Sequence, residues 1–124
     1  MMWYADKLSA SSDNGDVTIE NVVSKYGQAN NENGDIDIKY TSFDKLSVKN
    51  QNGDIAVKSS HISAGGDISN QNGDIELDKT ALPIFYAATQ NGDKEIKRSQ
   101  ASQETSKAAA ALRILNYNGD IEID

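Results

Sequence analysis

The sequence predicts an all-β fold, a single β-solenoid of about six rungs in which each repeat of the chain forms one rung. Two observations lead to this prediction. The triplet Asn-Gly-Asp starts at residues 14, 33, 52, 72, 91 and 118, so its copies are separated by 19, 19, 20, 19 and 27 residues. Apolar residues also recur at fixed distances from each triplet. A chain of 124 residues is short enough for one domain, residues 1–124.

Each predicted rung is centred on the glycine of its triplet, namely Gly15, Gly34, Gly53, Gly73, Gly92 and Gly119. Two positions later stand Val17, Ile36, Ile55, Ile75, Lys94 and Ile121, and four positions later stand Ile19, Ile38, Val57, Leu77, Ile96 and Ile123. Seven positions earlier stand Leu8, Gly27, Leu46, Gly66, Phe85 and Leu112, and five positions earlier stand Ala10, Ala29, Val48, Ile68, Ala87 and Ile114. These columns are the expected core.

Within each repeat, apolar residues alternate with other residues on both sides of the triplet. Leu46 and Val48 share one side of "KLSVKN", and Ile55 and Val57 share one side of "DIAVK". A period of two with β-branched residues is typical of strands that bury one face. Each repeat is therefore predicted to run strand, Asn-Gly turn, strand, second turn, and the glycine supplies the positive φ of the first turn.

A meander of Asn-Gly β-hairpins is the alternative fold, because Asn-Gly between alternating strands is a strong hairpin signal. The near-constant period favours the solenoid, since each rung must stack on another. The column three positions before the glycine also favours it, because stacked amides can form a hydrogen-bonded ladder. That column holds Ser12, Asn31, Asn50, Asn70, Thr89 and Asn116.

Two regions depart from the repeat. Lys94 interrupts an aliphatic column, and the alanine-rich residues 99–111 that follow predict a short helical or irregular excursion. Ile84 and Phe85 are adjacent, so both cannot point into the core. We expect residues 120–124 to form one end of the coil and Trp3 with Tyr4 to cover the other. A homodimer is then expected through a solenoid end, with residues 120–124 or the apolar strip 82–86 as the contact.

The segments "SSDNGDVTIE", "NENGDIDIK", "NQNGDIAVK", "NQNGDIELD" and "NYNGDIEID" resemble a bacterial family of adhesin-like β-helix proteins of unknown activity. The shared unit is a small residue or Asn, then Gly, Asp, an aliphatic residue, any residue and a second aliphatic residue. The resemblance covers residues 8 to 98 and 112 to 124. It implies a β-solenoid from a bacterium, often in a cell-surface or membrane-associated setting, and it implies no catalytic residues.

The composition narrows the classes of partner. The net charge is −7, which disfavours binding to nucleic acid or anionic lipid. The sequence contains no cysteine, which excludes disulfides and thiolate metal sites.

No run of 18 apolar residues occurs, so we expect no direct membrane insertion by this segment. If the chain is a fragment, we expect a cell-surface or membrane-associated location, and otherwise a cytoplasmic one.

The aspartates of the triplets are the main candidate site. Stacked rungs would place them about 5 Å apart along one edge, where carboxylates could bind a hard cation. The candidates are Asp16, Asp35, Asp54 and Asp74, followed along the chain by Asp93 and Asp120. The alternative, which we favour, is that each side chain accepts a hydrogen bond from a backbone N–H within its turn. We therefore expect no metal and no cofactor.

Three classes of function remain open. The preferred one is a non-catalytic solenoid module, a scaffold or adhesin-like binder of a protein or carbohydrate at a bacterial cell surface. A self-assembling structural protein that polymerises end to end is the second, and a carbohydrate-active enzyme is the disfavoured third. His61 is the only histidine and stands between two rungs, so no catalytic arrangement can be built around it. The aromatic residues are expected mainly to pack at corners and ends rather than to form a binding strip.

Overall fold

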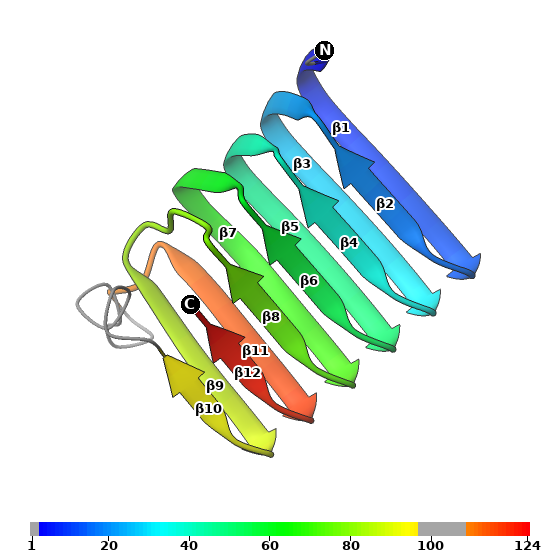
Figure 1. The fold of residues 1–124 in the computed structure, drawn as a ribbon, viewed down its shortest axis with the longest axis vertical. Coiled ribbons are helices and arrows are strands. Elements are labelled where there is room, and N and C mark those ends of the chain that lie inside the picture. Colours follow the sequence, from blue (N-terminus) through cyan, green and yellow to red (C-terminus); the bar gives the residue numbers. More distant parts are fainter. Residues whose placement is uncertain (1–2, 97–108) are drawn as a thin grey trace.

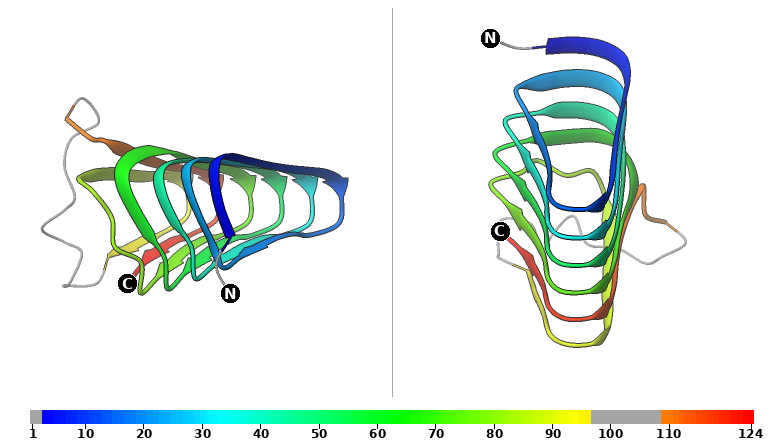
Figure 2. Two further views of the ribbon diagram at one scale, coloured as in Figure 1. Left: turned by 90° about the horizontal axis from the view of Figure 1, so that it is seen from above. Right: turned by 90° about the vertical axis from the view of Figure 1, so that its right-hand side faces the viewer.

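The computed structural model describes residues 3–96 and 109–124, which form a two-sheet β-solenoid (Figure 1). The first sheet holds the strands before each Asn-Gly-Asp corner: β1 (Trp3–Asn14), β3 (Val22–Asn33), β5 (Ser42–Asn52), β7 (His61–Asn72), β9 (Phe85–Asn91) and β11 (Leu112–Asn118). The second sheet holds the strands after it: β2 (Val17–Glu20), β4 (Ile36–Lys39), β6 (Ile55–Lys58), β8 (Ile75–Asp78), β10 (Lys94–Ile96) and β12 (Ile121–Ile123). Figure 2 shows the rungs as a stack of similar loops.

The strands within each sheet are parallel, and they pair in the register of the repeat. Ile36 pairs with Ile55, for example, and Asn31 pairs with Asn50. A meander of hairpins would place antiparallel neighbours beside each other. The solenoid prediction is therefore confirmed, and the hairpin alternative is wrong.

The order of the rungs differs from the order of the chain. The first sheet runs β1-β3-β5-β7-β11-β9, and the second runs β10-β12-β8-β6-β4-β2. The rung of β11 and β12, which comes last in the sequence, thus lies between the rung of β7 and β8 and the rung of β9 and β10 (Figure 1). The expectation that residues 120–124 form an end of the coil is wrong, because β12 pairs with β8 on one side and with β10 on the other.

Lys94 suits the outermost position in this order. It occupies the inward column that holds an isoleucine or valine in every other rung, and it begins β10, which pairs with β12 alone among the described strands. At this terminal position its side chain can turn to the rim of the rung, where Nζ donates a hydrogen bond to the carbonyl oxygen of Ala87 at 3.2 Å. Between two rungs the same ammonium would be buried in an aliphatic stack, at a cost of several kcal/mol (roughly).

The core is a narrow stack of aliphatic side chains between the two sheets. Most of the predicted inward columns are buried, including Ile36, Val48, Ile55, Ile75 and Ile121, each no more than 1% exposed. Leu8 and Ala10 of the first rung pack against this core and are partly buried. Hydrophobic residues make up only 37% of the chain. They are enough to form a continuous core in this architecture, because each rung buries the apolar residues of its neighbours.

Glycine at the first corner has two reasons: a positive φ in all six rungs, and a close approach to the neighbouring rung in every rung but the first. Gly53 has φ +132°, and a side chain on it would collide with the carbonyl group of Gly34 in the rung below. The second corner also uses positive φ, but without glycine: Asn21, Tyr40, Ser59 and Lys79 have φ between 49° and 57°. Only one of these is an asparagine, which explains why the second corner leaves no motif in the sequence.

Two local expectations have different outcomes. Phe85 is fully buried and Ile84 is 50% exposed, so the prediction that only one of them points inward is confirmed. Tyr4 is 77% exposed and lies in β1, so it does not cover the end of the coil. The Trp3 side chain and residues 97–108, which include most of the predicted alanine-rich excursion, lie outside the described residues.

Candidate functional site

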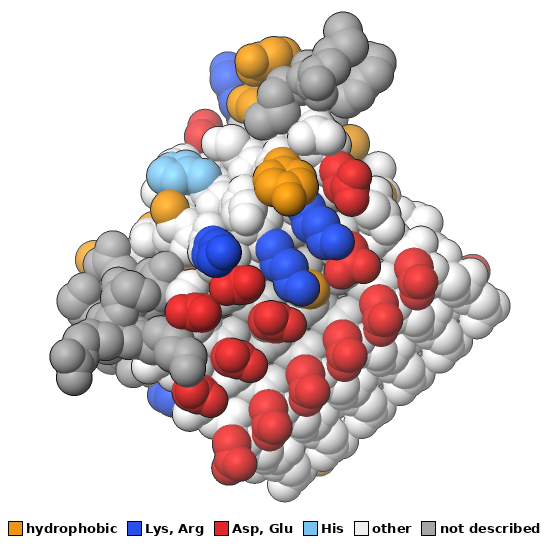
Figure 3. Space-filling model, viewed as in Figure 1, with side chains coloured by type: hydrophobic (Ala, Val, Ile, Leu, Met, Phe, Trp, Pro, Cys, Tyr) orange, Lys and Arg blue, Asp and Glu red, His pale blue; other side chains and the backbone are white. Residues whose placement is uncertain are grey.

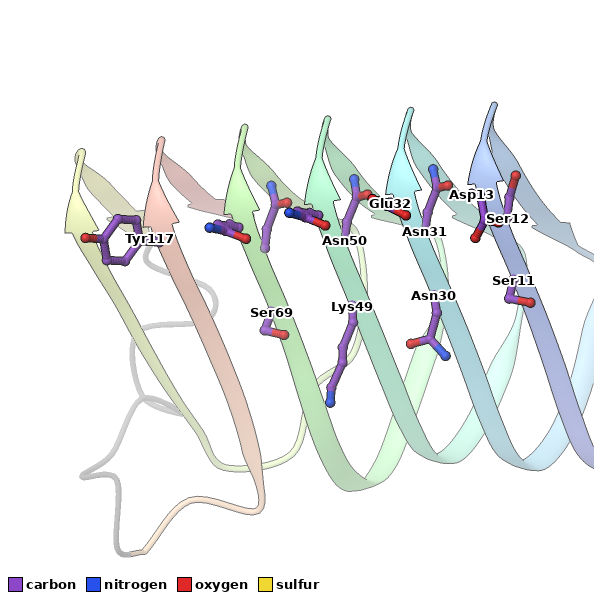
Figure 4. Close-up of a pocket in the computed structure, with 13 residues that line it drawn as sticks. Ser11, Ser12, Asp13, Asn30, Asn31, Glu32, Lys49, Asn50, Ser69 and Tyr117 are labelled. Atoms are coloured by element: carbon purple, nitrogen blue, oxygen red, sulfur yellow. The ribbon is translucent and has the colours of Figure 1, made fainter.

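A groove crosses the outer face of the first sheet, close to the first corner of the rungs (Figure 4). It has a volume of about 620 Å³. Two columns of outward residues contribute most of its walls, one four positions and one two positions before the repeat glycine. The first column supplies Ser11, Asn30, Lys49 and Ser69, and the second supplies Asp13, Glu32, Gln51, Gln71 and Tyr117.

The groove continues past Tyr117 over the remaining rungs. A second hollow of about 360 Å³ is lined by Ala88, Thr89, Gln90 and Leu115, and it shares Ser69, Asn70 and Tyr117 with the first. The shared residues make the two hollows adjoining parts of one groove. All six rungs therefore contribute to it, from β1 at one end to β9 at the other.

Strand register explains why the lining residues form straight lines. Ser11 pairs with Asn30, Asn30 with Lys49, and Lys49 with Ser69. Neighbouring strands lie about 4.8 Å apart, so the groove presents a polar side chain at each such step. Figure 4 shows Ser11, Asn30, Lys49 and Ser69 following one another across the sheet, with Tyr117 beyond them.

The charges within the groove are few and of both signs. Asp13, Glu32 and Lys49 line the part over β1, β3 and β5, and all three are exposed. The part between Ser69 and Gln90 is lined by uncharged residues. Tyr117, at the junction of the two hollows, is 48% exposed. The groove is thus nearly neutral and offers amides, hydroxyls and one aromatic ring.

The outer face of the second sheet has a different character. Figure 3 shows a row of acidic side chains along its edge, with further acidic side chains beside that row. The triplet aspartates form this edge, and they are linked from rung to rung. The Asp16 Oδ1 accepts a hydrogen bond from the backbone N–H of Asp35 at 2.9 Å, and the contact repeats up to the Asp120 Oδ1, which accepts from the N–H of Asp93 at 2.8 Å.

The aspartates therefore bond to backbone, as we expected, but not within their own turn. Each accepting carboxylate binds the N–H of the next rung in the spatial stack, as Asp54 does with Asp74. Among the described residues, no three histidine, aspartate or glutamate side chains are grouped so that they could hold a metal ion. A cation site at Asp16, Asp35, Asp54 and Asp74 stays an untested alternative.

Two columns of asparagine stabilise the first corner in different ways. The amide ladder is formed by the triplet asparagines: Asn33 Nδ2 donates to Asn14 Oδ1 at 3.0 Å, and Asn52 Nδ2 donates to Asn33 Oδ1 at 2.9 Å. The column predicted to form that ladder does not. Its amides donate instead to glycine carbonyls of the neighbouring rung, as Asn50 Nδ2 does to the Gly34 oxygen at 2.9 Å.

That inner column also leaves acceptors unused. The Oδ1 atoms of Asn31, Asn50, Asn70 and Asn116 are buried and accept no hydrogen bond within the described part of the chain. Thr89 fills the same position in the rung of β9 and donates to the Gly119 oxygen at 2.7 Å, without a second polar atom to satisfy.

The other residues singled out in the sequence are dispersed. His61 is exposed at the start of β7 and pairs with Ser42 on one side and Ala81 on the other. Phe43 and Phe85 are core residues, whereas Tyr4, Tyr26 and Tyr40 are exposed at separate places. Of the aromatic side chains that the structure describes, Tyr117 alone lines the groove. The described residues include no helix with the length and apolar character of a membrane span.

Parallel strands, one rung per repeat and corners built from Asn-Gly-Asp place this protein among the β-solenoid repeat proteins. The family model described as Toastrack DUF4097 matches residues 3–124, and the chain belongs to that family. The family is a repeat-type β domain of unknown function. No curated protein and no solved structure matches the chain.

Proposed function

We propose that this chain is a non-catalytic binding module and that its ligand lies in the groove on the outer face of the first sheet. One observation carries the proposal: the groove crosses all six rungs and is lined by amides, hydroxyls and an exposed phenol ring. Such groups recognise ligands by directional hydrogen bonds and by stacking. The stacked strands supply the rigid support that a binding site needs.

The module acts at a bacterial cell surface, as a scaffold or an adhesin-like binder. The support for this location is the resemblance of the Asn-Gly-Asp units to adhesin-like β-helix proteins, together with the polar groove that the fold displays to solvent. Detection of the full-length gene product in cell fractions tests the location. Recovery of the product only from the soluble cell interior would contradict it.

Binding without cleavage is the proposed activity, although the groove holds two carboxylates on adjacent rungs. Asp13 and Glu32 both line it, and glycoside hydrolysis uses a pair of carboxylates. One member of such a pair must be kept protonated by an apolar setting. Asp13 and Glu32 are both exposed to water, so neither has the apolar setting that the acid of such a pair needs.

Co-sedimentation with purified bacterial cell walls that retain peptidoglycan and attached polysaccharide tests the binding role. The wild-type protein should pellet with the walls, and Tyr117→Ala should pellet less. Tyr40→Asn is the matched control, because Tyr40 is exposed outside the groove and its φ of 54° suits asparagine. No new reducing ends should appear in the supernatant. A wild-type protein that stays in the supernatant would overturn the binding role. Reducing ends released into the supernatant would show that the protein cleaves polysaccharide instead of only binding it.

A further inference from the structure

Resting on the binding role proposed above, we infer that the groove holds an unbranched, uncharged polysaccharide chain that lies along the axis of the solenoid, with one sugar unit over each rung. The inference rests on three properties of the groove: its direction, its spacing and the chemistry of its lining.

The direction of the groove requires a long, thin ligand. Its lining residues come from successive rungs, so the groove runs across the strands and along the stack. Ser11 stands at one end of the row and Ala88 at the other, with Asn30, Lys49, Ser69 and Leu115 between them in register. A ligand that fills the groove must therefore be a polymer.

The spacing of the lining selects among polymers. Lining positions recur about every 4.8 Å, the distance between neighbouring strands. A β-linked pyranose chain advances by a similar length for each sugar, so each sugar in turn can lie over the lining residues of one rung. An extended peptide advances only about 3.3 Å per residue, so its residues cannot match the rungs one for one. A peptide would also find no unpaired backbone on a sheet face, since peptides add to sheet edges.

The chemistry of the lining matches sugar hydroxyls. Asn30, Gln51 and Gln71 present amides, which can donate to one hydroxyl and accept from another. Ser69 presents a hydroxyl at the middle of the groove. Tyr117 presents a half-exposed ring, and the C–H face of a pyranose can stack on such a ring.

The charges of the groove favour an uncharged chain. Asp13 and Glu32 would repel a polyanion at one end, and Lys49 beside them would repel a polycation. The other half, between Ser69 and Gln90, has no charged lining residue in the described chain. Nucleic acid is disfavoured in addition by the net charge of −7.

Titration of the purified protein with cellohexaose, chitohexaose and their disaccharides tests the inference. At least one hexasaccharide should bind more than about tenfold more tightly than its disaccharide, because more rungs are engaged. Tyr117→Ala should weaken that binding by about tenfold at an unchanged melting temperature. Gln71→Glu should weaken it less, and Tyr40→Asn should bind as the wild type does. Oligogalacturonate of the same length should bind more weakly than the neutral chain.

Three outcomes would overturn the inference: no binding of either hexasaccharide at millimolar concentration, equal affinity for hexasaccharide and disaccharide, or an affinity that Tyr117→Ala leaves unchanged. These outcomes are separable from failure of the binding role itself. A protein that pellets with cell walls through Tyr117 but binds neither hexasaccharide keeps the binding role and loses this ligand. A protein that pellets with no wall preparation loses the binding role as well.

Discussion

The ring of Phe43 occupies the space that a side chain on Gly27 would need. A Cβ atom built on Gly27 would lie 2.5 Å from Cε1 and 2.6 Å from Cδ1 of Phe43, far inside van der Waals contact. Gly27 belongs to a column that holds leucine or phenylalanine in four of the other rungs. The gap it leaves is filled by Phe43 from the next rung, so the two residues form one packing unit.

Gly27→Ala is expected to destabilise the protein by about 1–3 kcal/mol, the usual cost of overpacking a core. The double variant Gly27→Ala with Phe43→Leu should lose less than the sum of the two single variants, because leucine leaves room for the new methyl group. Chemical denaturation of the four proteins measures this coupling. Strictly additive losses would show that the two residues are not a packing unit.

Ile55→Asp and Ala56→Asp test the inward and outward columns. Ile55 is fully buried between two rungs, so an aspartate there buries an unpaired charge and should unfold the module. Ala56 is the neighbouring residue on the outer face, where its register partners are Asp37 and Glu76. Its substitution should cost about 1 kcal/mol or less, through repulsion alone. Equal melting temperatures of the two variants would contradict the alternation.

Asn50→Thr and Asn50→Asp test the inner asparagine column. Threonine keeps a donor for the Gly34 oxygen, as Thr89 does for Gly119, and it removes the buried Oδ1 that accepts no hydrogen bond. Its stability should stay within about 1 kcal/mol of the wild type. Ionised aspartate cannot donate and would face the Gly34 oxygen, so it should cost about 3 kcal/mol or more. Thermal melting at neutral pH measures the stability of both variants. An aspartate variant more stable than the threonine variant would refute the role of Asn50 as a hydrogen-bond donor.

Lys94→Ile tests the end of the coil. A lysine on the outermost described strand discourages further stacking, and isoleucine in its place would extend the apolar column to that strand. Sedimentation at tens of micromolar should show stronger self-association than in the wild type. Glu95→Gln is the control, since Glu95 is the exposed neighbour on the same strand. An unchanged association state for Lys94→Ile would mean that the lysine does not limit self-association at this end of the coil.

Calcium distinguishes the two interpretations of the triplet aspartates. If their carboxylates serve mainly to bind backbone N–H groups of the next rung, millimolar calcium should shift the melting temperature by about 1 °C or less. Asparagine at Asp35, Asp54 and Asp74 keeps an accepting oxygen and should preserve the fold. A large calcium shift that this triple variant abolishes would establish a cation site.

The alternation around each triplet was enough to predict strands, core columns and rungs. It was enough because the inward positions of stacked rungs must all be apolar, and Ile36, Ile55 and Ile75 record that requirement directly in the sequence. The spatial order of the rungs was not predicted, since the triplets at Asn91 and Asn118 are identical and fit either slot. The signal was Lys94, whose charge is tolerated only in a terminal rung.

The groove was not predicted for a different reason. Its residues occupy outward positions, where Ser11, Asn30 and Lys49 follow no common residue type. The repeat is defined by residues that are alike in every rung, whereas the groove is lined by residues that differ from rung to rung. Tyr117 differs from the acidic or amide residues at the same position of the other rungs, and that departure was the available sign.

The inserted rung has a consequence for synthesis of the chain on the ribosome. The segment of β9 and β10 emerges before the segment of β11 and β12, yet it must end up farther from the growing stack. Its Asn-Gly-Asp corner fits the open edge of β7 and β8 as well as the later corner does, so premature docking is a kinetic trap. Lys94 does not oppose this first docking, because its rung is then still terminal, but it opposes stacking of the next rung outside it, which would enclose its ammonium. The misordered stack is therefore expected to be less stable than the native one, in which the last thirteen residues take the inner slot.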